Sequence, residues 1–460
     1  MDHAKPSYLR QQGERIDLPW DDQFVDEIKV ALMACRVIPG LWLPKDYHIQ
    51  QEWTKKIARD TIANPKPLHP AVQDLKDLIE GDSRIYLLAN GMYDDIPANF
   101  TDPSGQPVVR SYTDMLSIMN HLLTIAPSWS EHENQVGLVG LPMHALLDWP
   151  MGTFHGHGFF LDPAVNAILK RVLDVWKDYL QSPASAEVLN NSTTGWFSPA
   201  AIKQLTAVAN VDGSSYSFNE LFVCDPSEKH YNFTSWDGFF TRAFRSERRP
   251  VAEPHNDSVI ANVCESLPFA IAHNVKRRDR FWVKGQPYSV EDMLGKDELS
   301  EHFVGGTIYQ AYLSSLSYHR WHAPVTGTIV KVAKFNGTYF SEPLFASMEI
   351  YGAWPKAPRY SQGYLSAVAA RAVIYIQADN PAIGLMAVVE VGMSEVSSCE
   401  VTVKEGQRVV KGDEMGMFHF GGSTHCLLFG KGVKVSGFPE PGSRTDNVPV
   451  RSRLAVVEEL

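Results

Sequence analysis

A serine directly behind two glycines is the part of this sequence best placed to do chemistry on the chain itself. The strand-like run 411–420 leads into Gly421-Gly422-Ser423-Thr424. Glycine tolerates positive φ at little steric cost, so a sharp bend can bring the Ser423 hydroxyl against the Gly422 carbonyl. Attack there would move the acyl group from nitrogen to oxygen, and elimination of the ester would split the chain, leaving a pyruvoyl group at Ser423. A simple turn is the alternative that the tetrapeptide leaves open.

Two histidines three residues apart provide a candidate base for this reaction. His319 and His322 lie in Tyr318-His319-Arg320-Trp321-His322, just before a strand-like segment. Imidazole titrates near neutral pH, so it can accept a proton from serine and later return one to a carbanion. A carboxylate behind the ring would fix its tautomer. A buried, purely hydrogen-bonding histidine pair is the structural alternative.

Four motifs in a fixed order resemble the phosphatidylserine decarboxylase family, and on them the chain is identified as a member. The histidine motif and the processing motif are two of them, and the other two precede both. In chain order the motifs are Phe239-Phe240-Thr241-Arg242 with Arg249-Pro250, then 283–295, then 318–327, then 418–424. The resemblance therefore spans residues 239–424.

The resemblance implies a self-processed precursor and assigns roles to individual residues. Ser423 would become the covalent pyruvoyl cofactor, with autocatalytic cleavage after Gly422. His322 resembles the base of the family's Asp-His-Ser triad, and His319 resembles the companion histidine near the substrate carboxylate. Glu265 stands where the family has the aspartate, and its extra methylene changes its reach toward His322.

Two more residues are expected to bind substrate. Arg320 could pair with a substrate carboxylate or form a structural ion pair, and the sequence leaves both open. Thr424, directly after the cleavage serine, is the second. In such an enzyme the pyruvoyl carbonyl forms a Schiff base with the substrate amine and accepts the electrons left when CO2 departs.

The substrate expectation comes from a narrower resemblance. A long N-terminal region, the pair Glu265-Ser266 and the segment 391–400 resemble a fungal branch of the family that contains the L-tryptophan decarboxylase of psilocybin biosynthesis. This implies a carboxy-lyase that converts a free aromatic L-amino acid, L-tryptophan first, to tryptamine and CO2. The alternative is a phosphatidylserine decarboxylase of phospholipid biosynthesis that makes phosphatidylethanolamine. A third possibility is a non-catalytic binding module on a degenerate scaffold.

The composition restricts the partners. Hydrophobic residues make up 44% and charged residues 21% of the chain, as in a soluble globular protein. A net charge of −11 disfavours nucleic acid, and no signal core or apolar run of ~20 residues predicts a membrane anchor. We expect a cytoplasmic protein with a small-molecule substrate, whose cleaved chains stay associated and which could form a homo-oligomer.

No metal site is expected from the sequence. The five cysteines are scattered without a Cys-x-x-Cys pair, which is typical of a reducing compartment. His155-Gly156-His157 could coordinate a metal, but a glycine-rich loop is the reading that we prefer.

The helices and strands expected from the sequence indicate an α+β fold. A helical N-terminal domain is expected at 1–235 and a β-rich catalytic domain, which carries the candidate site residues, at 236–460. Helices are expected at 70–79 and 111–125, and from Asp162-Pro163 onward, where aspartate can cap a long amphipathic helix. Strands are expected at 281–285, 328–332, 371–377 and 387–391. Segments 323–330 and 403–413 resemble the halves of a lipoyl- or biotinyl-type β-sandwich, and 351–364 reads as a surface loop.

Overall fold

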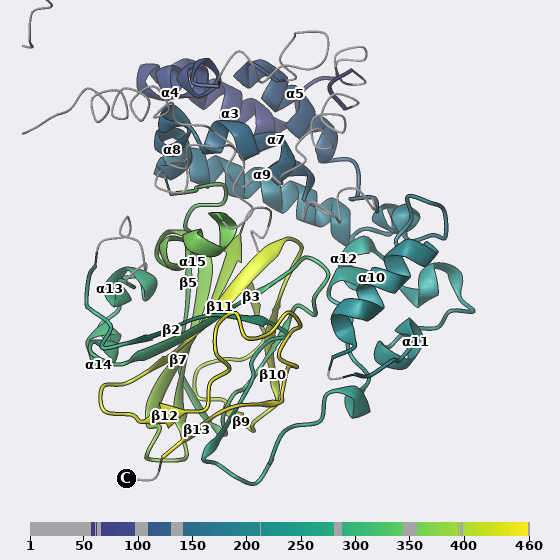
Figure 1. Ribbon diagram of the computed structural model, residues 1–460. Coiled ribbons are helices and arrows are strands. Elements are labelled where there is room, and N and C mark those ends of the chain that lie inside the picture. Colours follow the sequence, from purple (N-terminus) through teal and green to yellow (C-terminus); the bar gives the residue numbers. More distant parts are fainter. Residues whose placement is uncertain are drawn as a thin grey trace, which may run out of the picture. The chain divides into compact units, whose positions relative to one another are not determined.

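Helices dominate the N-terminal half of the described chain and strands the C-terminal half (Figure 1), which confirms the predicted α+β class. The computed structural model describes residues 57–59, 61, 66–96, 109–129, 141–211, 213–279, 288–343, 357–393, 395 and 399–458. The strand expected at 281–285, and with it part of the 283–295 motif, lies outside these residues. No result here tests the domain boundary placed at residue 235, so it stays a prediction.

The helical half follows the amphipathic patterns in the sequence. Asp162 caps the longest helix with its side chain, which accepts the N–H groups of Ala164 and Val165, and Pro163 occupies the first turn. Within the described part of the chain no helix is long and apolar enough to cross a membrane. The helices are α3 (Pro70–Gly81), α4 (Ser83–Asp94), α5 (Tyr112–Leu122), α7 (Pro142–Met151), α8 (Phe154–Leu161), α9 (Pro163–Gln181), α10 (Pro199–Ala209), α11 (Phe218–Leu221), α12 (Trp236–Phe240), α13 (Val290–Met293), α14 (Ser300–Phe303) and α15 (Ala357–Val368), with short 3-10 turns η2 (Pro183–Val188), η3 (Lys229–Asn232) and η4 (Ser246–Arg248).

Two segments expected to be loops are helical. His155-Gly156-His157 lies inside α8, where Thr153 caps the helix by accepting the N–H of Gly156. Glycine is needed there for packing rather than for a loop, because a Cβ at Gly156 would lie 1.8 Å from the Pro150 carbonyl oxygen. The second half of 351–364 belongs to α15, whose residues 361–365 are buried. Its first part, 351–356, lies outside the described residues.

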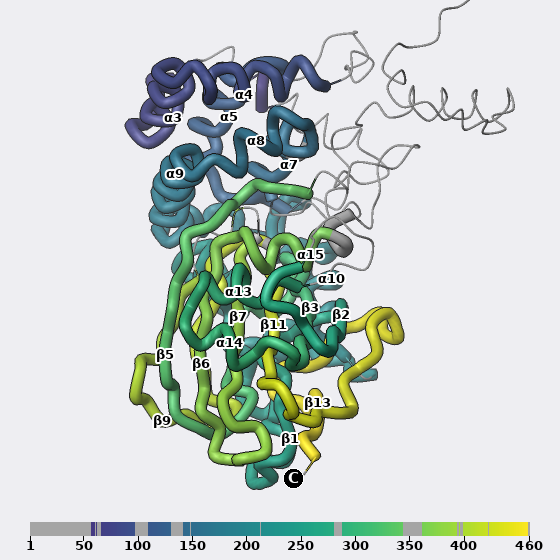
Figure 2. The backbone as a smooth tube through the Cα atoms, turned by 90° about the vertical axis from the view of Figure 1, so that its left-hand side faces the viewer, coloured from purple at the N-terminus to yellow at the C-terminus, as the bar shows by residue number. Residues whose placement is uncertain are grey.

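The largest sheet has seven strands in the order β2-β3-β11-β7-β6-β5-β9, which can be followed across Figure 2. Two three-stranded sheets, β1-β13-β12 and β4-β10-β8, accompany it. The strands are β1 (Val259–Ala261), β2 (Leu267–His273), β3 (Thr307–Leu313), β4 (Arg320–His322), β5 (Gly327–Phe335), β6 (Arg371–Ala378), β7 (Leu385–Met393), β8 (Cys399–Val401), β9 (Arg408–Val409), β10 (Glu414–Phe418), β11 (Gly422–Phe429), β12 (Val435–Ser436) and β13 (Arg453–Val457). The strands expected at 328–332, 371–377 and 387–391 are thus confirmed as β5, β6 and β7.

The large sheet has a hydrophobic core on each face, because side chains alternate along a strand. On β11, Cys426 and Leu428 join the core that the helices share, whereas Leu427 and Phe429 join a second core. The second core also contains Trp321 of β4 and Leu454 of β13, so the small sheets close a sandwich against the large one. The two segments read as sandwich halves meet where β5 pairs with β9.

Candidate active site

Ser423 lies at the start of β11, an interior strand of the large sheet. There it is paired with Leu313 of β3 on one side and with Gly392 of β7 on the other. The chain enters β11 through Gly421, whose φ of +129° favours glycine. The Ser423 side chain is 1% exposed, and no described residue forms a hydrogen bond with its Oγ. A buried hydroxyl without a partner is uncommon, and this one is free to act as a nucleophile.

The histidine motif lies beside the processing segment because β4 pairs with β10. Met417 is opposite Arg320, and the Phe418 N–H donates to the His319 carbonyl at 2.9 Å. His322 pairs with Glu414, at the other end of β10. The backbone register therefore places His319, rather than His322, next to the end of β10 that leads toward Ser423.

His319 is fully buried and neutral. Its ring stacks on Phe240 with centroids 4.1 Å apart, and neither ring nitrogen has a hydrogen-bond partner among the described residues. Burial, together with the nearby Arg242 guanidinium, lowers the pKa of His319 to about 3. Arg242 is itself fixed by the Leu316 carbonyl at 2.7 Å. At neutral pH the ring thus keeps an unshared lone pair that can receive a proton.

His322 is held by three groups that sequence reasoning did not single out. Its Nδ1 lies 3.0 Å from the Gly412 carbonyl and 3.2 Å from Arg451 Nε, and its Nε2 lies 3.1 Å from the Tyr318 hydroxyl. Arg451 donates to the same Gly412 carbonyl at 2.9 Å. Burial first, and then Arg451, lower the pKa of His322 to about 3. Tyr318 belongs to the quoted motif and could have been noticed there, but no local signal points to Arg451.

Glu265 forms no hydrogen bond with His322 in this structure, so the pairing predicted for it is not formed. Its carboxylate accepts two N–H groups of Arg249, at 2.9 and 2.5 Å, and the Val450 N–H at 2.8 Å. Both side chains are buried, at 7% exposure for Arg249 and 1% for Glu265. A buried guanidinium requires a counter-ion, and Glu265 supplies it within the described part of the chain.

Arg320 and Thr424, the two expected substrate-binding residues, both have protein partners. Arg320 donates to both carboxylate oxygens of Glu414, at 2.9 and 3.0 Å, and to the Thr241 carbonyl at 2.7 Å. This is the structural ion pair that the sequence left open. Thr424 lies on the opposite face of β11 from Ser423, where its hydroxyl donates to the Ala311 carbonyl at 2.8 Å.

Aromatic rings of α9 and α12 pack on the processing segment. Phe420, three positions before Ser423, meets Trp176 of α9 at 4.8 Å and Trp236 of α12 at 4.5 Å, both edge-on. Phe240, the ring that stacks on His319, lies 5.6 Å from Phe420. Both tryptophans therefore act as core residues, and they connect the helices to the segment that carries the nucleophile.

A buried histidine between two carboxylates fixes the same segment. His419 Nδ1 lies 3.0 Å from Asp237, and its Nε2 lies 2.6 Å from Glu400. Burial opposes the charged ring, but the two carboxylates outweigh it and raise the pKa of His419. The processing segment is thus tied to α12 on one side and to β8 on the other.

The residues at Ser423 fit a serine-derived pyruvoyl group. The hydroxyl is buried and unpartnered among the described residues, Gly421 two positions earlier has a positive φ, and the motif that holds neutral His319 borders the same segment. Chemically, this arrangement can expose the Gly422 carbonyl to attack while excluding water.

Comparisons with known proteins assign the chain to one family. Two family models, both described as phosphatidylserine decarboxylase, match residues 69–205 and 236–447. The chain is 44% identical to decarboxylase iboD of Amanita muscaria over 338 residues, 72% of this chain and 95% of that protein. It is 33% identical to the L-tryptophan decarboxylase of Psilocybe cubensis over 420 residues, 87% and 91% of the two chains. With phosphatidylserine decarboxylase proenzyme 3 of Schizosaccharomyces pombe it shares 29% identity over 228 residues, 50% of this chain and 22% of that protein.

Proposed function

Because this chain belongs to the phosphatidylserine decarboxylase family and is a decarboxylase, we propose that it acts on a free aromatic L-amino acid, with L-tryptophan as the first candidate. The family is pyruvoyl-dependent in general. In this chain the cofactor would come from Ser423 after cleavage behind Gly422. Tryptamine and CO2 would be the products.

One observation carries the substrate proposal. The similarity to the Psilocybe L-tryptophan decarboxylase extends over 87% of this chain, whereas that to the Schizosaccharomyces phosphatidylserine decarboxylase covers 50%. A match of 87% must include much of the helical half, and α9 in that half places Trp176 on Phe420 of the processing segment. Decarboxylation of phosphatidylserine is the second candidate, favoured by the matches to enzymes of that name.

The buried groups support the cleavage part of the proposal. Ser423 Oγ attacks the Gly422 carbonyl while a neutral imidazole receives the hydroxyl proton, and the backbone register favours His319 for that step. Elimination from the resulting ester then breaks the chain, leaving a carboxylate on Gly422 and a dehydroalanine at position 423. This dehydroalanine tautomerises to an imine, and water hydrolyses the imine to the pyruvoyl group with release of ammonia. When formed, a pyruvoyl carbonyl supplies a sink for the electron pair released as CO2 leaves.

We also propose that the two products of cleavage stay together. The C-terminal product would hold 38 residues (460 minus 422) and would begin with β11. That strand is hydrogen-bonded on both sides, to β3 and to β7, and β13 of the same product pairs with β1 of the other. Glu265 adds a buried bond across the break through the Val450 N–H. Separating the products would expose these paired edges.

The test combines intact mass with a substrate panel. Purified protein should show a chain ending at Gly422 and a 38-residue partner (460 minus 422), and it should form tryptamine faster than it forms amines from tyrosine, phenylalanine or phosphatidylserine vesicles. Ser423→Ala should stay uncleaved and inactive. Ser443→Ala, an exposed serine in the same product, serves as the matched control and should behave as wild type.

Each other outcome counts against a named part of the proposal. Phosphatidylethanolamine as the main product would establish the lipid alternative. A wild-type chain that stays uncleaved would favour the non-catalytic scaffold. Activity that survives in Ser423→Ala would refute the role of that serine.

A further inference from the structure

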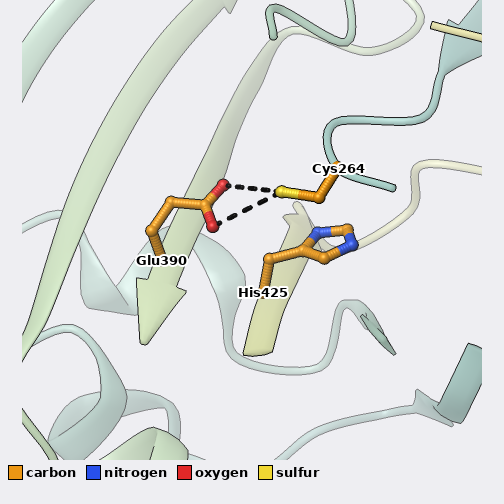
Figure 3. A group of neighbouring side chains, drawn as sticks. All are labelled: Cys264, Glu390 and His425. Atoms are coloured by element: carbon orange, nitrogen blue, oxygen red, sulfur yellow. Dashed lines mark hydrogen bonds between the residues drawn. The ribbon is translucent and has the colours of Figure 1, made fainter. Parts of the chain in front are cut away.

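Three chemically reactive side chains meet on the second-core face of the large sheet, two positions along β11 and β7 from Ser423 and Gly392. Cys264 lies between β1 and β2, Glu390 lies on β7 and His425 lies on β11 (Figure 3). We call these residues the buried trio. All three are 0% exposed, and one potential ligand atom from each lies within 4.8 Å of the other two. Sequence spacing gave no sign of the trio, because its members come from three distant segments.

Strand register fixes two members of the trio. His425 and Glu390 are direct partners across β11 and β7. His425 is two positions from Leu427 on β11, and Glu390 is two positions from Val388 on β7. Leu427 and Val388 belong to the second core, so His425 and Glu390 point to that same face of the sheet. Cys264 approaches from the small-sheet side, and its Sγ lies 3.7 and 3.8 Å from the Glu390 carboxylate oxygens.

The hydrogen bonds leave the imidazole ready to act as a ligand. Ser266 donates to the Cys264 carbonyl at 3.1 Å, so its oxygen can accept from His425 Nε2, which lies 3.0 Å away. That assignment puts the ring proton on Nε2 and leaves a lone pair on Nδ1. Nδ1 has no hydrogen-bond partner among the described residues, and in Figure 3 it is the ring nitrogen turned toward Cys264 and Glu390. In metal-binding histidines the ring nitrogen that does not bind the metal commonly donates to an oxygen acceptor, which fixes the orientation of the ring.

We propose that the buried trio binds a divalent transition-metal ion, with Zn²⁺ as the best match, through Cys264 Sγ, a Glu390 oxygen and His425 Nδ1. Thiolate, carboxylate and imidazole are the donors that Zn²⁺ takes in proteins, and borderline-soft ions prefer sulfur and nitrogen over the all-oxygen sets of Ca²⁺ or Mg²⁺. The proposal does not depend on the decarboxylase substrate.

Metal binding at the trio would have to displace protons, because burial favours the neutral thiol and carboxyl. Desolvation first raises the pKa of Cys264 and of Glu390 well above their usual ranges. A bound cation would deprotonate the thiol and the carboxyl and would offset the desolvation of both anions. If the chain is cleaved as proposed, His425 belongs to the C-terminal product and the other two ligands to the N-terminal one, so the ion would also clamp the two products together.

The test is metal content and coordination in the full-length protein. Protein supplied with Zn²⁺ and dialysed against metal-free buffer should retain about one zinc per chain, and X-ray absorption should show one sulfur at about 2.3 Å. Replacing zinc by Co²⁺ should produce a thiolate-to-cobalt absorption band. Cys264→Ser should abolish that band and lower zinc retention by about tenfold or more.

Cys426→Ser is the matched control. Cys426 is the next residue on β11 after His425 and is equally buried, but it belongs to the opposite core, so this variant should keep the metal and the band. Zinc below about a tenth of an equivalent in wild type, or equal retention in Cys264→Ser, would overturn the proposal. The X-ray measurement needs no variant, so a zinc shell without sulfur would overturn it even where Cys264→Ser fails to fold.

Discussion

Replacing Glu265 by glutamine tests whether this residue orients His322, as the sequence predicts, or neutralises Arg249, as the structure shows. The sequence predicts that this carboxylate orients His322. In the structure it neutralises Arg249 and accepts the Val450 N–H. If the observed contacts are its function, Glu265→Gln should act first on the stability of the fold. Removing Arg249 should then reproduce its effect on cleavage.

The size of the effect follows from burial. Arg249 is 7% exposed and Glu265 is 1% exposed, so glutamine would leave a guanidinium unpaired in the interior. Removing one partner of a buried ion pair lowers the free energy of unfolding by about 3–5 kcal/mol, because the other charge is left unpaired. Removing both charges together costs much less. The double variant Arg249→Met/Glu265→Gln should therefore cost less than the two single changes added together, by on the order of 2–3 kcal/mol.

Unfolding should be measured in the Ser423→Ala background, so that every chain is intact. Denaturation followed by fluorescence gives the four free energies of the double-mutant cycle. The exposed pair of Arg408 and Asp379 provides the control, because Asp379→Asn should cost less than about 1 kcal/mol. In chains that keep Ser423, the rate of cleavage should then be compared between Arg249→Met and Glu265→Gln.

Two results would refute this reasoning. A loss of under about 1 kcal/mol in Glu265→Gln would mean that the buried pair does not matter for stability. Cleavage that stops in Glu265→Gln but proceeds normally in Arg249→Met would restore the orienting role for His322 that the sequence suggests.

Two further predictions concern stability. Burial lowers the pKa of His319, His322 and His425 to about 3. Between about pH 6.5 and 3 the unfolded chain therefore binds more protons than the folded chain. The free energy of unfolding should fall as the pH decreases through that window, by up to ~1.4 kcal/mol per pH unit for each histidine. Denaturation at pH 7, 6 and 5 checks this, and a flat profile would contradict it. Trp176→Ala should lower the free energy of unfolding by about 3–5 kcal/mol and slow cleavage, because this ring packs on Phe420. Asp178→Ala, at an exposed position of the same helix, should change stability by less than about 0.5 kcal/mol. Equal effects of the two substitutions would contradict this prediction.

Local patterns were sufficient for the elements and for the nucleophile. The helix capped by Asp162, the strands around β5, β6 and β7 and the glycine bend before Ser423 all depend on neighbouring residues in the chain. Local patterns failed at His155-Gly156-His157, where glycine serves close helix packing, and within 351–364, where prolines and aromatics hid the helix α15.

Sequence by itself therefore determined the α+β class, the family and the residue able to attack its own backbone, because motif spacing and side-chain period are properties of contiguous segments. Only the tertiary structure decided the partners of the charged and polar groups: Arg249 with Glu265, Arg320 with Glu414, and Cys264 with Glu390 and His425. These pairings are set by strand register and by the need to neutralise or hydrogen-bond buried groups. Both act between residues far apart in the chain, where sequence spacing carries no signal.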